Sequence, residues 1–352
     1  MRVIKQRKKT RVIHVGSVAI GGNNPISVQS MTKTDTRDVK STVKQIRALA
    51  GSGCEIIRIA VPDLEAAKAL GRIKRSVSIP VIADIHFDWR LALEAIRQGV
   101  DGLRINPGNI GTRWKVAEVV SAASDRAIPI RIGVNAGSLP KRLVEKYGHP
   151  VPEALVESAA EHIEILEGLR FRDIKVSLKA SNVPMTVDAY RLFTRRFRYP
   201  LHIGISEAGP LFTGMIKSSV GLGILLSEGI GDTMRVSLSA DPLEEVKVAF
   251  EILKSLGLRQ KGPNIISCPT CGRCEIDIRG IAAKVEKRLE KIDKPVTVAV
   301  MGCVVNGPGE AREADIGIAG GKGFGLLFRK GKVVKKVSED NLLDELLGEI
   351  EG

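Results

Sequence analysis

The first 257 residues alternate between short runs rich in β-branched and apolar residues and longer segments with the period of a helix. Eight short runs predict strands, at residues 26–32, 55–62, 80–87, 102–107, 129–135, 173–180, 200–208 and 233–240. Helices are predicted between them, at residues 39–51, 63–76, 89–99, 152–168, 187–196 and 242–257. Eight strand–helix units over about 250 residues are typical of a TIM (β/α)8 barrel. A short hairpin is predicted before the first of them, at residues 12–21.

A doubly wound open sheet is the alternative for this pattern. Such a sheet normally has a Gly-rich nucleotide loop after its first strand. The corresponding stretch here is Gln29-Ser-Met-Thr32, which contains no glycine. We therefore predict the barrel for residues 1–257.

A smaller domain is predicted at residues 264–352, after a linker at residues 258–263 that is polar and contains Gly and Pro. Strands are predicted at residues 264–267, 296–301, 315–319, 324–329 and 332–337, and helices at 276–291 and 339–350. The dipeptide Lys330-Gly331 is a turn signal that joins the last two strands into a hairpin. We expect an α+β domain with a mostly antiparallel sheet.

The composition narrows the class of protein. No apolar run approaches the roughly 20 residues that span a bilayer, and residues 1–11 are basic but lack the apolar region of a secretory signal. We therefore predict a cytoplasmic protein without membrane contact. The formal net charge is +14, which fits an anionic substrate or an acidic partner. Nucleic acid is disfavoured because the basic residues are spread out and aromatic residues make up only 4%.

Charged and polar residues stand near the ends of the predicted barrel strands, where apolar residues are expected. Five of them are cations: Arg58, Arg104, Arg131, Lys179 and Arg235. Active sites of TIM barrels lie at the carboxyl ends of the strands, so these side chains are expected at one mouth. Structural ion pairs are the alternative, but only two acids, Asp84 and Glu207, accompany the five cations. Because arginine matches phosphate oxygens in pairs, we predict an anion site.

Three other strand-end residues have a predicted role. Glu207 is a candidate acid or base because it is a carboxylate beside a cation-rich pocket. His86 is a weaker candidate, and His202 is predicted to be structural. Cys54, at the start of a strand, is predicted to be a buried apolar residue.

Four of the five cysteines lie between Cys268 and Cys303, in Cys268-Pro-Thr-Cys271-Gly-Arg-Cys274 and in Met301-Gly-Cys303. Clustered thiols in a reducing compartment indicate a metal rather than disulfides. Structural zinc is possible, but zinc knuckles usually supply two close pairs, and Cys303 has no close partner in sequence. The looser spacing favours an iron–sulfur cluster. Spacing leaves open whether Cys274 is a ligand or whether another group takes the fourth position.

Several motifs together resemble one known family, the 4-hydroxy-3-methylbut-2-enyl diphosphate synthases of the methylerythritol phosphate route to isoprenoids. The resemblance spans nearly the full length. Its motifs are Val28-Gln-Ser-Met-Thr32, Ala83-Asp-Ile-His-Phe87, Arg104-Ile-Asn-Pro-Gly-Asn109, Arg131-Ile-Gly-Val-Asn135, His202-Ile-Gly-Ile-Ser-Glu-Ala-Gly209, Gly229-Ile-Gly-Asp-Thr233, Cys268-Pro-Thr-Cys271 and Met301-Gly-Cys-Val-Val-Asn-Gly-Pro-Gly-Glu310.

The resemblance implies a 4Fe-4S cluster bound by Cys268, Cys271, Cys303 and the carboxylate of Glu310, with Cys274 as a bystander. It also implies that the small domain is similar to the cluster domain of sulfite and nitrite reductases. The implied substrate is 2-C-methyl-D-erythritol 2,4-cyclodiphosphate, which is opened and reduced to the linear allylic diphosphate and water. Flavodoxin or ferredoxin is the implied electron donor. The implied assembly is a homodimer in which the cluster of one subunit caps the barrel of the other.

The resemblance also assigns roles to single residues. The five strand-end cations would hold the diphosphate, with Asn135 and His86 assisting. Glu207 would donate a proton to the departing hydroxyl, and Asn306 would orient the substrate near the cluster. Two competing hypotheses give the cysteines a structural zinc: a barrel transferase of the pterin-binding type, and a nucleic-acid-binding protein without catalytic activity.

Overall fold

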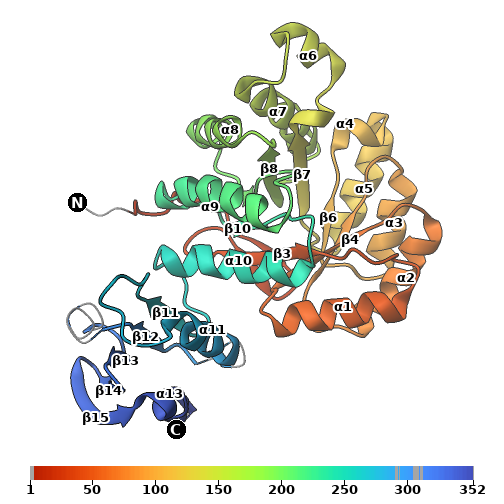
Figure 1. The fold of residues 1–352 in the computed structure, drawn as a ribbon. Coiled ribbons are helices and arrows are strands. Elements are labelled where there is room, and N and C mark those ends of the chain that lie inside the picture. The colour runs from red at the N-terminus through yellow and green to blue at the C-terminus, as the bar shows by residue number, and fades with distance from the viewer. Residues whose placement is uncertain (1–3, 290–291, 293, 304–308, 310–311, 352) are drawn as a thin grey trace. The chain divides into compact units, whose positions relative to one another are not determined.

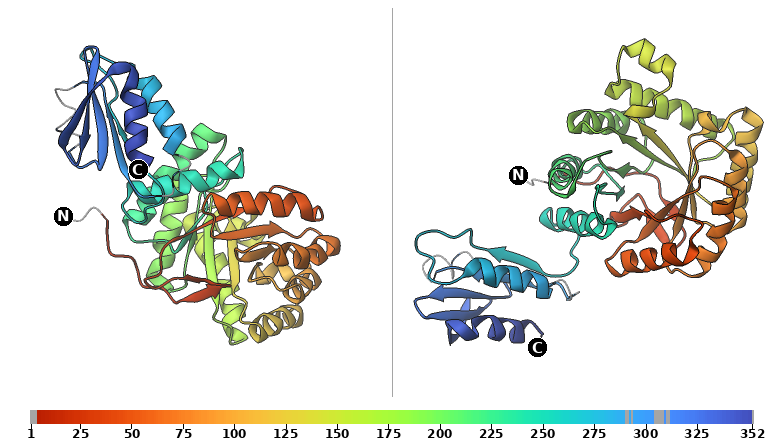
Figure 2. Two further views of the ribbon diagram at one scale, coloured as in Figure 1. Left: turned by 90° about the horizontal axis from the view of Figure 1, so that it is seen from below. Right: turned by 45° about the vertical axis from the view of Figure 1, so that its right-hand side comes forward.

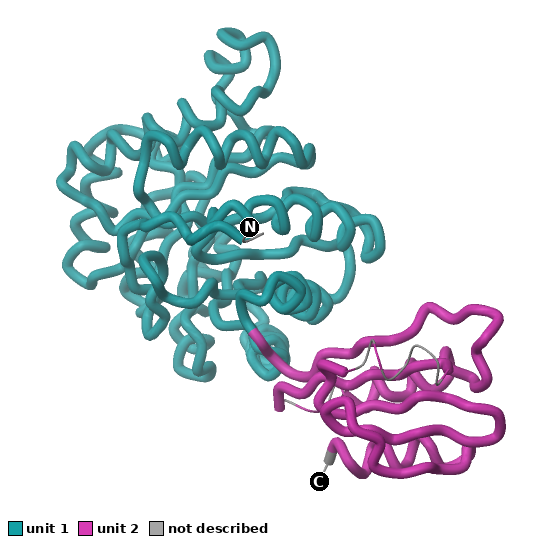
Figure 3. Tube along the Cα trace, turned by 90° about the vertical axis from the view of Figure 1, so that its left-hand side faces the viewer, with its two compact units in different colours: residues 1–259 teal, residues 260–352 magenta. Residues whose placement is uncertain are grey.

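The structure is a computed structural model that describes residues 4–289, 292, 294–303, 309 and 312–351 (Figure 1). The chain divides into two compact units, unit 1 at Met1–Arg259 and unit 2 at Gln260–Gly352 (Figure 3).

Eight parallel strands form a barrel in unit 1. They are β3 (Ser27–Met31), β4 (Ile56–Ala60), β5 (Val81–Asp84), β6 (Gly102–Arg104), β7 (Ile130–Asn135), β8 (Ile174–Lys179), β9 (His202–Ile203) and β10 (Thr233–Met234). They pair in the order β8-β7-β6-β5-β4-β3-β10-β9, and a bridge between Val176 and Leu201 joins the two ends of that order. Each predicted run contains one of these strands, so the predicted TIM barrel is confirmed.

A helix follows each barrel strand, and these helices surround the strands (Figure 2). They are α1 (Val39–Gly51), α2 (Leu64–Arg75), α3 (Trp89–Arg97), α5 (Arg113–Asp125), α7 (Pro152–Gly168), α8 (Val183–Arg196), α9 (Leu211–Ser227) and α10 (Pro242–Ser255). Asp38, Asp63 and Asn182 cap three of them by accepting a backbone N–H of the first turn, which stabilises a helix by about 1 kcal/mol each. The loops after β6 and β7 also contain α4 (Pro107–Ile110), η1 (Ala136–Ser138) and α6 (Lys141–Tyr147).

The interior of the barrel is polar, whereas most TIM barrels are filled by apolar side chains. Along β8, Ile174, Val176 and Leu178 belong to the apolar core that includes the surrounding helices. Successive strand residues point to opposite faces, so the side chains between them point into the barrel. Those are Lys175, Ser177 and Lys179, all buried.

A small apolar cluster joins the N-terminal hairpin to the barrel. The hairpin consists of β1 (Ile13–Val15) and β2 (Val18–Ile20), which pair antiparallel as predicted. Its residues Ile13, Val15 and Ile20 pack against Ile56 of β4 and Ile82 of β5. Since Ile56 begins β4, the hairpin covers the amino ends of the strands, opposite the mouth.

Unit 2 is an α+β domain. Its strands β11 (Asn264–Ser267), β12 (Thr297–Met301), β13 (Ile316–Gly321), β14 (Phe324–Arg329) and β15 (Lys332–Ser338) pair in sequence order. The helices α11 (Ile278–Leu289) and α13 (Leu342–Glu351), the latter preceded by η2 (Glu339–Asn341), lie together on one side of this sheet (Figure 2). None of the described helices is long and apolar enough to cross a membrane.

The expectation of a mostly antiparallel sheet in unit 2 is wrong. The pairs β11–β12 and β12–β13 are parallel, and the pairs β13–β14 and β14–β15 are antiparallel. Parallel neighbours need a long crossover connection. The connection from β11 to β12 includes α11, and the one from β12 to β13 spans residues 302–315. Only the last three strands are joined by short turns.

Candidate active site

The predicted cations lie inside the barrel, on β4, β6, β7 and β8 and directly after β10. Arg58, Arg104 and Lys179 stand at or near the carboxyl ends of β4, β6 and β8, and Arg235 directly follows β10. Arg131 is only the second residue of β7, where it pairs with Arg104, the last residue of β6. The prediction that all five stand at strand ends is therefore wrong for Arg131.

Asp84 is the carboxylate between two of these cations. Its oxygens lie 3.4 Å from Nε of Arg58 and 3.5 Å from Nη1 of Arg104. The pKa of Asp84 lies below its ordinary value. Burial raises this pKa, but the combined attraction of Arg58, Arg104 and Arg131 lowers it by more than burial raises it. Burial in turn lowers the pKa of Arg58 to about 10. Asp84 is thus ionised, and its negative charge offsets one of the two positive charges of Arg58 and Arg104.

Arg235 pairs with Glu245 of α10, a residue that the strand-end pattern did not identify. The guanidinium Nε lies 3.2 Å from the carboxylate of Glu245, a residue that is 1% exposed. The same carboxylate accepts a hydrogen bond from the hydroxyl of Ser30 and lies 3.4 Å from Nζ of Lys33. A sequence signal was present: Glu245 is in helical phase with Ala249 and Ile252, which face the core. A carboxylate on the buried face of a helix requires a cationic partner.

Arg131 and Lys179 have no carboxylate within ion-pair distance among the described residues. Both are buried, and the Nε and Nη1 groups of Arg131 lack any hydrogen-bond partner there. Burial, and then repulsion by the other cations, lowers the pKa of both groups well below their ordinary values. Such groups bind an anion readily, because a buried charge without a partner is unfavourable.

Two glycines make room for these cations. A Cβ at Gly133 would lie 2.5 Å from Nε of Arg104, and one at Gly204 would lie 2.5 Å from Nζ of Lys179. Asn106 fixes this part of the barrel by donating to the carbonyl of Gly133 and accepting from its N–H, both at 2.9 Å. Neither glycine was identified from the sequence, although each stands two residues after a buried polar residue on its strand.

The remaining predicted residues differ in exposure. His86 is half-exposed and lies 3.2 Å from Nη1 of Arg104, and burial lowers its pKa. Asn135 ends β7 and is partly buried. Glu207 is exposed in the loop after β9 at φ 50°, and no cation within the described part of the chain forms an ion pair with it.

Two residues predicted to be structural are buried. His202 is 0% exposed, and its Nδ1 lies 3.3 Å from Oγ1 of Thr233. Cys54 is 2% exposed, and burial raises the pKa of its thiol to about 12. Such a thiol is unreactive.

The cysteines of unit 2 follow two parallel neighbouring strands. Cys268 comes directly after β11, and Cys303 comes two residues after β12. Contact with Cys271, and then attraction to Cys303 and Cys268, raises the pKa of Arg273. The three cysteines thus act on the same exposed guanidinium, with Cys271 as its main partner. Cys274 is turned to its own chain, where its thiol donates to the carbonyl of Ile276 at 3.2 Å.

Within the described residues, no three Cys, His, Asp or Glu side chains are close enough to hold a metal ion as they stand. Two predicted residues, Asn306 and Glu310, lie outside the described residues. The donor set is otherwise soft thiols, which suits iron–sulfur or zinc.

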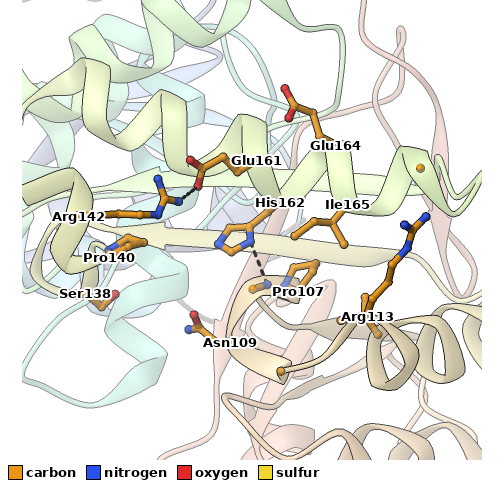
Figure 4. A pocket seen from close by; sticks show the side chains of 14 residues that line it. Pro107, Asn109, Arg113, Ser138, Pro140, Arg142, Glu161, His162, Glu164 and Ile165 are labelled. Carbon is orange, nitrogen blue, oxygen red and sulfur yellow. Dashed lines mark hydrogen bonds and ion pairs between the residues drawn. The ribbon is translucent and has the colours of Figure 1, made fainter. Parts of the chain in front are cut away.

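A cavity of about 770 Å³ lies outside the barrel strands, among α4, α5, α6 and α7 (Figure 4). His162 lines it and accepts a hydrogen bond from the N–H of Gly108 at 3.1 Å, and burial lowers its pKa to about 4. Arg142 and Glu161 form an ion pair at one end. The cavity contains none of the predicted site residues.

A closed barrel with an excess of buried cations, followed by a unit whose cysteines follow two neighbouring parallel strands, defines a TIM-barrel enzyme for a multiply charged anion. The chain belongs to the GcpE family. The GcpE TIM-barrel domain matches residues 10–250, and the GcpE protein C-terminal domain matches residues 264–352.

Relatives match over the whole length. The chain is 66% identical to the 4-hydroxy-3-methylbut-2-en-1-yl diphosphate synthase (flavodoxin) of Geobacter sulfurreducens over 345 residues, which is 98% of each chain. It is 64% identical to the enzyme of the same name from Thermodesulfovibrio yellowstonii, covering 98% of this chain and 99% of that one. For the Bacillus subtilis enzyme of that name the identity is 60%, with coverage of 99% and 92%.

Solved structures share the barrel fold alone. A dihydropteroate synthase from Yersinia pestis, in a sulfonamide complex, has a TM-score of 0.51 at 12% identity, covering 71% of this chain and 100% of that one. The enzyme from Xanthomonas albilineans has a TM-score of 0.50 at 11% identity with the same coverage. The hypothesis of a pterin-type transferase is therefore right about the barrel, but the family is a different one.

Proposed function

We propose that this chain catalyses the reductive ring opening and dehydroxylation of 2-C-methyl-D-erythritol 2,4-cyclodiphosphate to 4-hydroxy-3-methylbut-2-enyl diphosphate in isoprenoid biosynthesis. The observation that carries this proposal is the barrel interior: among the described residues, only two carboxylates, Asp84 and Glu245, form ion pairs with the five predicted cations. A diphosphate supplies the missing negative charge. Membership of the GcpE family gives that diphosphate its identity.

The charge of the ligand changes during this reaction. The cyclic diphosphate is a dianion, since each phosphorus carries one ionised oxygen. Two electrons and one proton convert it to water and a linear diphosphate. The terminal phosphate gains a second ionisation with a pKa near 6, so the product is a trianion at neutral pH. The site must therefore hold three negative charges at the end of a turnover.

The diphosphate is held by Arg58, Arg104, Arg131, Lys179 and Arg235. Guanidinium groups donate two parallel hydrogen bonds to phosphate oxygens and remain charged. Asn135 and His86 assist, because both flank this set at the carboxyl end of the barrel. Burial of these cations makes each contact stronger than it would be in water.

Glu207 donates the proton to the departing hydroxyl group. Its support is its place in the loop after β9, on the side of the barrel where the cations lie. Because the reaction consumes a proton, a carboxylic acid at this position supplies what the cations cannot.

A 4Fe-4S cluster supplies the two electrons one at a time when it is bound. Its ligands would be Cys268, Cys271, Cys303 and Glu310, and the position of Cys268 and Cys303 after two neighbouring parallel strands supports the cysteine part of that set. The hydrogen bond from the thiol of Cys274 to the carbonyl of Ile276 supports the exclusion of Cys274 from the cluster ligands. The hard carboxylate of Glu310 is the weakest ligand of the four. Asn306 orients the substrate.

The electron donor is a flavodoxin or a ferredoxin. The active form is a homodimer, and the compartment in which it acts is the cytoplasm. Relatives named for flavodoxin support the donor. In the dimer, the cluster of one subunit caps the barrel of the other. An active monomer by light scattering would contradict this arrangement.

Iron and sulfide analysis of anaerobically purified protein tests the cluster. About four iron and four sulfide ions per chain are expected for a 4Fe-4S cluster, together with a brown colour. Turnover of the cyclic diphosphate with reduced flavodoxin tests the reaction. Iron-free protein that is fully active would contradict the proposal, and zinc in its place would restore the alternatives with a structural zinc.

A further inference from the structure

The barrel holds a second buried lysine below Lys179. Lys175 stands four residues before Lys179 on the same face of β8 and is 2% exposed. Its Nζ has no hydrogen-bond partner among the described residues. None of the roles assigned above uses this side chain.

The register of the sheet places Lys175 at the end of a row of charges. Asp84, Arg104, Arg131 and Lys175 occupy paired positions on four successive strands. Asp84 lies against Arg104, whereas the next two residues have no carboxylate in contact within the described chain. Neighbouring strands are about 5 Å apart, so Arg131 and Lys175 are two like charges side by side in a medium of low dielectric constant.

The other groups that face Lys175 do not offset the repulsion between Lys175 and Arg131. Asp232, before β10, attracts it, but its carboxylate already accepts from the N–H of Leu201 and the hydroxyl of Thr10. His202 of β9 is buried nearby and is kept neutral by burial and by repulsion from Lys179, Arg131 and Lys175.

Arg131 and Lys175 differ in how easily they lose a proton. Burial lowers the pKa of both groups, but a guanidinium starts from a higher ordinary pKa than an ammonium group and keeps its proton more readily. Lys175 is therefore the member of the pair that becomes neutral. In agreement, burial and then repulsion by Arg131 lower its pKa to about 7.

We propose that Lys175 matches the charge of the barrel to the charge of the ligand: it is neutral while the cyclic diphosphate occupies the mouth and takes up a proton when the linear diphosphate forms. This rests on the proposed function, in which a dianion becomes a trianion. The added negative charge attracts a proton to the interior. Protonated Lys175 then offsets the third charge, and the proton returns to solvent when the product leaves.

The test is isothermal titration calorimetry of iron-loaded, anaerobic protein at pH 8, in two buffers with different ionisation enthalpies. The linear diphosphate is fully ionised at this pH, so proton uptake reports on the protein. We expect its binding to take up about one more proton than binding of the cyclic diphosphate. Lys175→Met should remove this difference and weaken binding of the linear diphosphate roughly tenfold, with little change for the cyclic one.

Two further variants separate the alternatives. Lys175→Arg carries a permanent charge, so it should bind the linear diphosphate tightly without proton uptake. It also decides the question if Lys175→Met does not fold. His202→Gln should keep the wild-type proton uptake.

Uptake that persists in either Lys175 variant, or equal uptake with both ligands in the wild type, would overturn the assignment of Lys175. Failure of the wild type to bind either diphosphate would instead contradict the proposed function.

Discussion

At the scale of single residues, the anion site depends on small neighbours as much as on the cations. Gly133 and Gly204 leave the space that Arg104 and Lys179 occupy, and a methyl group at either position would overlap a charged nitrogen. Close approach is thus the reason for glycine here. The backbone conformation is not, because neither residue has a positive φ.

Gly204→Ala should displace Lys179 and lower kcat/KM for the cyclic diphosphate. The new Cβ would lie 2.5 Å from both Nζ of Lys179 and the carbonyl oxygen of Arg235. A displacement of about 1 Å at a binding group reduces the rate roughly 100-fold. Gly223→Ala on α9 is the control, because nothing lies within 4 Å of a Cβ there, and it should keep wild-type kinetics. Wild-type kcat/KM in Gly204→Ala would refute this role.

Glu207→Gln should abolish most turnover, by about 100-fold or more, because an amide cannot donate the required proton. The side chain is exposed and forms no ion pair within the described chain, so the fold and the visible spectrum of the cluster should remain unchanged. Steady-state kinetics and absorbance spectra check both expectations. Full activity would remove Glu207 from the mechanism.

The stability of the unliganded protein should rise with pH between about 7 and 10.5 through Lys175. The folded protein releases this proton near pH 7, whereas the unfolded chain keeps it to 10.5. Unfolding therefore takes up a proton in this window, and the free energy of unfolding increases by about 1.4 kcal/mol per pH unit. Chemical denaturation at pH 7 and pH 9 measures it. In Lys175→Met, the free energy of unfolding should increase by about 1.4 kcal/mol per pH unit less than in the wild type. An identical increase in both proteins would contradict the lowered pKa of Lys175.

At the scale of elements, parallel pairing of β11 and β12 brings the cysteine segments together. Both strands end at the same edge of the sheet, with Ser267 paired to Val300, so Cys268 and Cys303 emerge close to each other although they are far apart in sequence. An antiparallel pairing would have placed them at opposite edges. The parallel connection through α11 is therefore a condition for the thiol set.

Cys271→Ala should lose most of its iron, whereas Cys274→Ala should keep it. Cys271 is an exposed thiol whose pKa is lowered by hydrogen bonding with Arg273, whereas Cys274 is hydrogen-bonded to its own backbone. Iron and sulfide content, with the visible spectrum, distinguishes the variants. Equal loss of iron in both would make Cys274 a ligand.

At the scale of the whole molecule, the chain has a net charge of +14 and is divided into a barrel unit and a thiol-bearing unit. Such a charge accelerates encounter with an acidic protein at low ionic strength. It also attracts an anionic substrate. The charge therefore acts on association rates more than on the fold.

Turnover driven by reduced flavodoxin should fall several-fold as ionic strength rises from about 0.05 M to 0.5 M, because the Debye length shortens from above 10 Å to below 8 Å. Turnover with reduced methyl viologen, a small cation, gains nothing from that attraction and serves as the control. Kinetics over this salt range with a saturating substrate measure the difference. If turnover falls equally with both reductants, salt weakens binding of the anionic substrate rather than the encounter with flavodoxin.

Much of this architecture was predictable from the sequence. The eight strand runs and the helices between them follow from local periodicity, which the chain shows without tertiary contacts. The excess of cations among the strands was also visible, because residues such as Arg58 and Lys179 interrupt apolar runs. Glu245 was overlooked, because its helix shows an ordinary amphipathic pattern apart from that one residue.

By itself, the sequence determined the repeating strand–helix pattern, the supply of positive charge to the strands and the clustering of the thiols, because each depends on residues close together in the chain. Only the tertiary structure decided which charges are compensated. Asp84 stands between Arg58 and Arg104, and Glu245 reaches Arg235 from α10. Within the described residues, Arg131 and Lys175 are left side by side with no carboxylate in contact. The physical reason is that barrel closure sets which strand positions share the interior and which carboxylates reach it.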